Sequence, residues 1–169
     1  MLTGDPKAPN PGVGDNDTTI PTTAWVNAAI AAALPPAQGG DFWARSSAGV
    51  ATPTSLTVVW PNTINTGNSG GWFNPANGRY TPAAGRYFIR AQLWIPSTTA
   101  AVGTNIQIRK NGATVLCAAG QVPGNAGWWA DPRCDCLVDA TGLDYFEMMV
   151  STGAPQTAFY DFLAMPSRR

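Results

Sequence analysis

The residues of this chain that could do chemistry are its carboxylates and cysteines, because the 169-residue sequence contains no histidine. Histidine is the commonest general base and zinc ligand, so catalytic triads and ordinary zinc hydrolase sites are excluded. Glycoside hydrolysis needs two carboxylates at a defined separation. Glu147 is the single glutamate, and its available partners are Asp131, Asp135, Asp139 and Asp144. Their spacing is not diagnostic of a catalytic pair or of a calcium loop, so we expect no enzyme, no catalytic residue, no metal site and no cofactor.

The remaining reactive side chains are Cys117, Cys134 and Cys136. Cys134 and Cys136 flank one residue, so on a strand both thiols point to the same face, and a bridge between them is sterically poor. A bridge from Cys117 to one of them, across strands, leaves one thiol free or bridged to another chain. The alternative is that all three are buried thiols that act as small hydrophobic residues.

Two loops, residues 61–72 and 120–132, combine tryptophan with asparagine, which suits sugars. A ring face packs on the C–H groups of a pyranose, while side-chain amides bond its hydroxyl groups. The predicted ligand-binding residues are Trp72, Trp128, Trp129, Asn68 and Asn125. The alternative is that these tryptophans pack beneath their own loops.

The composition excludes several partners and favours β-structure. The formal net charge is zero, so we expect no nucleic acid partner, which would need a set of phosphate-neutralising cations. The longest apolar run, residues 28–34, is far shorter than the ~20 residues of a membrane span, and the first residues lack the pattern of a secretory signal. With 18 glycines, 15 prolines and only 12% charged residues, the chain favours strands and turns over long amphipathic helices.

Residues 1–40 are predicted to form an arm with one short helix. Four prolines prevent a helix in residues 1–21. A helix signal follows in residues 22–34, with Val26 and Ile30 on one side and Trp25 beside them. A helix of about twelve residues is only marginally stable in isolation. Its apolar side therefore has to pack against another surface, which is its own domain, symmetry-related copies or a larger body. The predicted anchor residues are Pro6, Pro9, Trp25, Val26 and Ile30.

Residues 41–169 are predicted to form one domain of short strands joined by turns. Single strands are predicted in residues 55–60, 86–95 and 156–165, a loop that leads into a short strand in residues 65–74, and two strands around a turn in each of residues 103–120 and 134–151. Asn111-Gly112 is a strong signal for a tight hairpin turn. Short strands at fairly regular spacing with no helix between them indicate an antiparallel sandwich or barrel.

The run Arg86–Ile95 carries large side chains on both faces. One face has Tyr87, Ile89, Ala91, Leu93 and Ile95, and the other has Arg86, Phe88, Arg90, Gln92 and Trp94. A two-layer sandwich covers only one face of a strand, so aromatic residues on the second face need another cover. We predict that Phe88 and Trp94 are buried against other copies of the chain, where Arg90 finds an acceptor. The alternative is that a long loop of the same chain covers them.

The motifs of residues 42–166 come in an order that resembles the globular head of complement's first component and its tumour-necrosis-factor-like relatives. The resemblance rests on a "PGxYxF"-type strand, a "KNG" hairpin, a "GDxV"-like strand start and a terminal "F-x-GFL". The matching residues are Gly85, Tyr87 and Phe88; Lys110, Asn111 and Gly112; Gly142 and Asp144; and Phe159, Phe162 and Leu163, with Asp161 where the family often has glycine. This resemblance implies a ten-stranded antiparallel jelly-roll sandwich that assembles as a homotrimer through Phe88, Trp94 and Arg90.

Residues 4–33 resemble a segment that recurs in tail and fibre proteins of bacteriophages and prophages, where it precedes a variable receptor-facing domain. The resemblance implies a location in the virion, other virion structural proteins as partners of the arm, and release by lysis. We therefore expect a trimeric short fibre, spike or decoration, with contact to host-surface polysaccharide as one expected role of its loops. The alternative is a free-standing carbohydrate-binding lectin-like module, which would not need the arm.

Overall fold

A computed structural model describes residues 26–27, 40–68, 70–96, 103–122, 127 and 129–167. The chain divides into two units, Met1–Ala37 and Gln38–Arg169, and the second is a domain built from strands. Val26 and Asn27 have helical backbone within the predicted helix; the rest of that prediction lies outside the described residues. Across the described part of the chain, no helix has the length and apolar character needed to cross a membrane.

The first sheet contains the longest strands of the domain. Its strands follow the order β10-β7-β12-β1-β4, and β2 pairs with the beginning of β12. All of these pairs are antiparallel. The bounds are β1 (Phe42–Arg45), β2 (Val50–Ala51), β4 (Thr63–Gly67), β7 (Ala84–Trp94), β10 (Arg133–Thr141) and β12 (Thr157–Pro166).

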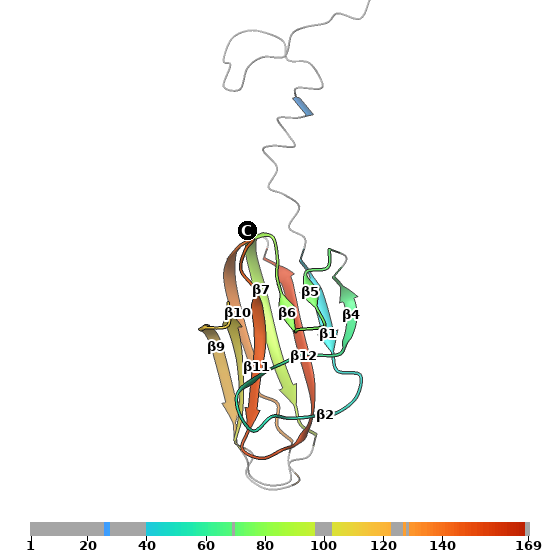
Figure 1. Ribbon diagram of the computed structural model, residues 1–169, viewed down its shortest axis with the longest axis vertical. Coiled ribbons are helices and arrows are strands. Elements are labelled where there is room, and N and C mark those ends of the chain that lie inside the picture. Colours follow the sequence, from blue (N-terminus) through green and yellow to red (C-terminus); the bar gives the residue numbers. More distant parts are fainter. Residues whose placement is uncertain are drawn as a thin grey trace, which may run out of the picture. The chain divides into compact units, whose positions relative to one another are not determined.

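The second sheet packs against the first and is also antiparallel (Figure 1). Its strands follow the order β5-β6-β11-β8-β9, and β3 pairs with β11 beyond the end of β6. The bounds are β3 (Thr57–Val59), β5 (Phe73–Asn74), β6 (Arg79–Tyr80), β8 (Thr104–Lys110), β9 (Thr114–Gln121) and β11 (Phe146–Thr152). The all-β class and the two-sheet sandwich expected from the sequence are confirmed.

The number of strands differs from the expected ten, because the described residues form twelve. Four of them, β2, β3, β5 and β6, have only two or three residues. Such short strands arise where a loop runs beside a long strand and exchanges a few backbone hydrogen bonds with it. The extra count therefore comes from the loops rather than from a different architecture.

The core lies between the two sheets and contains one face of β7. Tyr87, Ile89, Ala91, Leu93 and Ile95 are fully buried, which confirms the inward register predicted from the sequence. A group of aromatic rings fills the part of the core near the start of β1. Phe42 stacks on Phe73 at 4.6 Å between ring centroids and meets Phe162 edge-on at 5.2 Å. Burial of such rings contributes much of the stability of a domain of this size.

The chain enters and leaves this domain at one end, which we call the base. Phe42 at the start of β1 pairs with Ala164 near the end of β12, and Figure 1 shows the start of β1 and the end of β12 at the same end of the domain. The hydroxyl of Tyr80 donates a hydrogen bond to the carbonyl of Gly40. Gly40 has a φ of +131°, and a Cβ there would lie 2.8 Å from the Tyr80 hydroxyl, so this residue just before β1 has to be glycine.

The opposite end, which we call the tip, is where β7 and β9 finish. Ile95 and Ala130 bond each other through both backbone groups just beyond these strands. The amide of Gly153, after β11, donates to the carbonyl of Gly103, before β8. The tip is therefore held by backbone hydrogen bonds between loops, and it lies a full strand length from the point where the arm joins the domain.

Candidate functional site

The outer face of the first sheet brings together the residues predicted to form an interface. Phe88, Arg90 and Trp94 alternate with the buried residues of β7, so all three point away from the core. Odd-numbered residues of β10, β12 and β1 lie on the same face, because each pairs with an outward residue of the neighbouring strand. The result is a set of rows that cross the sheet from strand to strand.

One row is apolar across three strands. Leu137 of β10 pairs with Phe88 of β7, and Phe88 pairs with Met165 of β12. Leu137 is 51% exposed and Met165 is 48% exposed, with Phe88 half-buried between them. Leu137 and Met165 thus form an apolar strip at the surface of the domain on either side of Phe88.

The next row combines an ion pair with apolar side chains. Arg90 binds Asp135 through two hydrogen bonds, at 2.8 Å from Nε and 3.4 Å from the terminal nitrogen. The Arg90 guanidinium also lies 5.4 Å from the centre of the Phe88 ring, within the range of a cation–π contact. On the other side of Arg90, Leu163 and Trp43 complete the row. Arg90 thus finds its acceptor within its own chain, whereas we expected one across an interface.

A charged row follows towards the tip. Arg45 lies 3.4 Å from Asp161, and Arg133 lies 3.4 Å from Asp135. Gln92, between these pairs, donates a hydrogen bond to Asp131 at 2.6 Å. Burial raises the pKa of the Asp161 carboxyl above its ordinary value, although Arg45 acts in the opposite direction. Most charges on this face are therefore neutralised within the chain, which lowers the free-energy cost of burying them against a partner.

The last row is the aromatic pair of Trp94 and Phe159. Their ring centroids are 5.2 Å apart at an interplanar angle of 34°. Trp94 remains 39% exposed in spite of this contact. The exposed tryptophan is thus held in one orientation by a neighbour on its own sheet, and it offers a rigid apolar surface to a partner.

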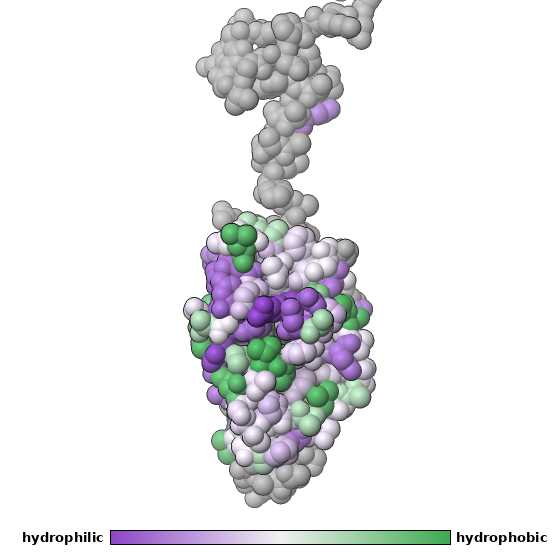
Figure 2. Space-filling model, in the orientation of Figure 1, coloured by the Kyte–Doolittle hydropathy of each residue, from purple (hydrophilic) through white to green (hydrophobic). Residues whose placement is uncertain are grey.

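The same face is hollowed near the base. A cavity of about 340 Å³ is lined by Asp41, Phe42, Trp43, Leu163, Ala164 and Met165. Its apolar walls continue the rows described above, because Trp43, Leu163 and Met165 belong to both. A hollow with such walls suits burial against a protein partner better than it suits chemistry on a substrate. Figure 2 shows one side of the domain, where small hydrophobic patches lie among hydrophilic ones.

The two loops predicted to bind sugar lie at opposite ends of the domain. Asn68 donates its backbone amide to the carbonyl of Asp41, and Trp72 accepts from the amide of Thr81 next to Tyr80, so these two residues lie at the base. The loop that contains Trp129 follows β9 and lies at the tip, next to the bridge between Ile95 and Ala130. The loops therefore cannot form one continuous ligand site.

Asn68 and Trp72 have partners within the domain. The Asn68 side-chain amide donates to the carbonyl of Phe73 at 2.9 Å and accepts from its N–H at 2.6 Å. Trp72 packs against the core. These contacts give both residues a role in the local fold and leave the amide of Asn68 occupied. At the tip, Trp129 is 61% exposed, while Trp128 and Asn125 lie outside the described residues.

Glu147 lies on a different sheet from two of the carboxylates considered as its partners. Glu147 is buried on the outer side of the second sheet, 3.7 Å from Arg79, whereas Asp131 and Asp135 belong to the polar contacts of the first sheet. No group of acidic and cysteine side chains able to hold a metal ion occurs in the described part of the chain.

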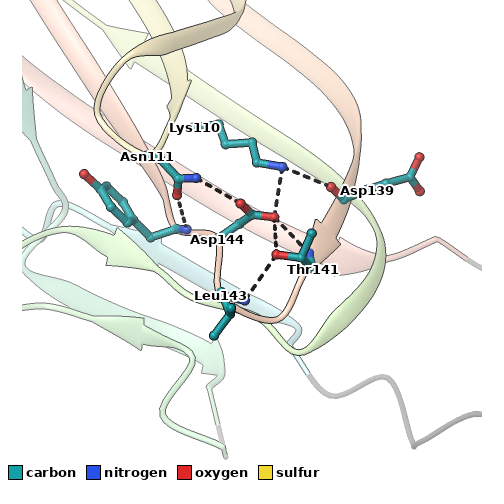
Figure 3. Close-up of polar contacts among 7 residues, drawn as sticks. Lys110, Asn111, Asp139, Thr141, Leu143 and Asp144 are labelled. Atoms are coloured by element: carbon teal, nitrogen blue, oxygen red, sulfur yellow. Dashed lines mark hydrogen bonds and ion pairs between the residues drawn. The ribbon is translucent and has the colours of Figure 1, made fainter.

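Asp144 organises a polar network at the base (Figure 3). Its carboxylate accepts from Asn111 at 2.9 Å and from both the backbone and the hydroxyl of Thr141 at 2.8 Å, and it lies 2.9 Å from Lys110. These contacts, that of Lys110 first, hold the pKa of the Asp144 carboxyl well below its ordinary value. The network joins the hairpin between β8 and β9 to the turn between β10 and β11.

The predicted hairpin at Asn111-Gly112 is confirmed. Asn111 and Gly112 both have positive φ, at 54° and 74°, and the amide of Ala113 donates to the carbonyl of Lys110 across them, as in a turn of type I′. Asn111 also exchanges two bonds with Tyr145: its backbone amide donates to the Tyr145 carbonyl, and its side-chain oxygen accepts from the Tyr145 amide. The "KNG" motif thus has a structural role that the turn signal alone does not reveal.

Cys117, Cys134 and Cys136 are free thiols that lie at the edge where β9 and β10 meet. Of the predicted anchor residues, Val26 is described and is partly buried, and Pro6, Pro9, Trp25 and Ile30 lie outside the described residues. Sequence reasoning missed several residues of the outer face of the first sheet: Trp43, Leu137, Phe159, Leu163 and Met165. The same alternation that identified Phe88 and Trp94 on β7 was present on β10 and β12.

Comparison with known proteins identifies the fold. No protein-family model matches the chain, and no curated protein matches it in sequence. Among solved structures, the globular domain of the zebrafish complement 1qA protein is similar, with a TM-score of 0.63 and 10% sequence identity over 77% of this chain and 98% of that one. The Eiger tumour necrosis factor from S. frugiperda has a TM-score of 0.50 and 8% identity over 78% and 95% of the two chains. At these identities the likeness shows a shared jelly-roll fold.

Proposed function

We propose that this chain is a structural protein of a bacteriophage virion: a homotrimeric short fibre, spike or decoration attached through its N-terminal arm. The observation that carries the proposal is the outer face of the first sheet, where the apolar row of Leu137, Phe88 and Met165 is exposed beside Trp43 and Trp94. A chain that functioned alone would have no reason to present these rows to water.

The trimer is supported by two independent considerations. The sequence resemblance to complement heads and tumour-necrosis-factor-like domains implies a three-fold assembly, and the likeness in fold agrees with it. The physical argument needs no relative, because burying exposed apolar area stabilises an assembly by about 25 cal/mol per Å² before entropic costs. Three copies of this face around an axis would cover it in a closed, soluble particle.

The two ends of the domain support the fibre-like arrangement. The arm joins at the base, through Gly40 and β1, and the exposed Trp129 and Val122 lie at the tip. An arm that binds the particle would leave the tip facing outward. The resemblance of residues 4–33 to tail and fibre segments supports the virion as the site of attachment.

The decisive measurement is the mass of the purified chain in solution by light scattering or sedimentation. We expect about three times the chain mass of 17.7 kDa. The substitution Leu137→Asp places a carboxylate in the apolar row and should give monomers. Val115→Asp is the matched control, because Val115 is 47% exposed on the outer side of the second sheet, and it should leave the trimer intact. A wild-type monomer, or equal effects of both substitutions, would refute the trimer.

The alternative, a free-standing lectin, is favoured by a single observation, the 61% exposure of Trp129. The virion proposal predicts that Val26→Asp combined with Ile30→Asp releases the protein from purified particles without changing its mass. The lectin alternative predicts that this double variant behaves as wild type in every assay, while Trp129→Ala loses binding to host-surface polysaccharide. Release from particles together with loss of polysaccharide binding by Trp129→Ala would mean that the virion protein contacts glycans at its tip.

A further inference from the structure

Three cysteines gather where the sandwich is open at one side. β9 is the end strand of the second sheet and β10 is the end strand of the first, and the two lie side by side (Figure 1). Cys134 and Cys136 pair with the fully buried Ala91 and Ile89, and Cys117 pairs with the fully buried Ile108. All three side chains therefore point inward across this edge.

The thiols differ in exposure and in charge. Cys134 is 5% exposed, whereas Cys117 and Cys136 are only partly buried, so small reagents can reach the cluster. Hydrogen bonds from Cys134 and Cys136 lower the pKa of the Cys117 thiol to about 4. The hydrogen bond to Cys117, together with burial, raises the pKa of both other thiols. The direction of these shifts makes Cys117 the thiol of the group that loses its proton most readily, and the thiolate is the nucleophile in disulfide chemistry.

We propose that this cluster is a site of reversible thiol oxidation, in which Cys117 forms a disulfide with either Cys134 or Cys136 and so bridges the two sheets. The choice of partner follows from geometry. Cys134 and Cys136 are two residues apart on one strand, where a bridge is sterically poor, while Cys117 faces both from across the edge. Because all three point inward, a bridge to another chain is not favoured.

The oxidant is a small disulfide such as oxidised glutathione, and the reaction is thiol–disulfide exchange. The Cys117 thiolate attacks one sulfur of the small disulfide, which forms a mixed disulfide and releases one thiolate. The thiol of Cys134 or Cys136 then loses its proton to solvent and attacks the Cys117 sulfur, which forms the protein disulfide and releases the second thiolate. Two protein thiols are oxidised, one small disulfide is reduced to two thiols, and the third cysteine remains free.

The test uses the full chain, first reduced and then incubated with oxidised glutathione. Counting thiols in denaturant should give three per chain before oxidation and one after it. Non-reducing peptide mapping should link the tryptic peptide 111–133, which contains Cys117, to the peptide 134–168. Closing a loop of ~18–20 residues should raise the melting midpoint by about 6–12 °C, and a reducing agent should reverse the rise. Three thiols per chain after oxidation, or a bridge between chains on a non-reducing gel, would overturn the proposal.

Variants identify the attacking residue and the exchange of partners. Cys134→Ser and Cys136→Ser should each still form one disulfide with Cys117, because either partner suffices. The double variant Cys134→Ser with Cys136→Ser should stop at the mixed disulfide and gain the mass of one glutathione per chain. Cys117→Ser should retain two free thiols after oxidation. A variant without Cys117 that loses both thiols, or a double variant that gains no glutathione, would overturn the assignment of Cys117 as the central sulfur.

Discussion

The two sheets share one core but present different outer faces. On the first sheet, five large hydrophobic side chains are exposed: Trp43, Val50, Trp94, Leu137 and Met165. On the strands of the second sheet, Val115 is the single residue of that kind among the described residues. The fold needs only the inner faces, so the difference between the outer faces must serve something other than folding of the chain.

The outer face of the second sheet has the composition of a surface that stays exposed to solvent. Glu147 pairs in register with Arg79 and Arg109 on the neighbouring strands, so charge lies at its centre. The first sheet also contains ion pairs, but Arg90 and Asp135 lie beside an apolar row. Paired charges between apolar rows are a pattern that a partner can bury without leaving a charge uncompensated. The comparison therefore supports the proposal that the inner faces serve folding and that one outer face serves assembly.

The largest effect on stability is expected at the Asp144 network, which both sheets share. Asp144→Ala removes the acceptor that ties the hairpin of the second sheet to the turn after β10. We expect a loss of about 2–3 kcal/mol in the free energy of unfolding, measured by urea denaturation. The mass of the assembled protein should not change at pH 7. A change of mass without a loss of stability would mean that the base, rather than the sheet face, holds the copies together.

The same residue gives a pH dependence with a definite sign. Because the pKa of Asp144 is lower in the folded chain than in the unfolded chain, its contribution is fully present above the ordinary value of about 3.9 and is lost as the pH falls below it. The wild-type chain should therefore lose more stability between pH 5 and pH 3 than Asp144→Asn does. Parallel losses in the two proteins would show that other groups cause the acid sensitivity.

Alternation along the chain was enough to predict the long strands and the inward face of β7. Tyr87, Ile89 and Leu93 are fully buried as predicted, because a period of two leaves a strong signal over eleven residues. The Asn111-Gly112 turn was equally clear, since its positive φ angles demand those residue types. These predictions depended on local physics alone.

Predictions that depend on which strands are neighbours could not be made from the sequence. β1 has four residues, too few for a period to be recognised, yet it places Trp43 on the candidate interface. The loops with Trp72 and Trp129 look alike in composition, but pairing of strands places them at opposite ends of the domain. The position of Cys117 opposite Cys134 and Cys136 likewise depends on β9 and β10 being end strands of different sheets.

A matched pair of substitutions tests the comparison of the two faces more finely. Arg79 and Arg90 each pair with a carboxylate, one on each sheet. Arg79→Met leaves the buried Glu147 without its ion pair and should cost about 1–2 kcal/mol of unfolding free energy while the trimer persists. Denaturation and light scattering on the same sample would measure both quantities. Loss of the trimer with Arg79→Met would contradict the assignment of assembly to the first sheet.

Arg90→Met should have the smallest effect on the chain and a clear effect on assembly. Asp135 keeps Arg133 at 3.4 Å and is 30% exposed, so the unfolding free energy should change by less than about 1 kcal/mol. In the proposed trimer, the Asp135 carboxylate would face the other copies without Arg90 beside it. We therefore expect the variant trimer to begin to dissociate at a protein concentration at least about tenfold higher than the wild-type trimer does. Concentration-dependent sedimentation measures this directly. If Arg90→Met destabilised the chain more than Arg79→Met did and left dissociation unchanged, the ion pairs of the first sheet would serve folding, and the distinction between the two faces would fail.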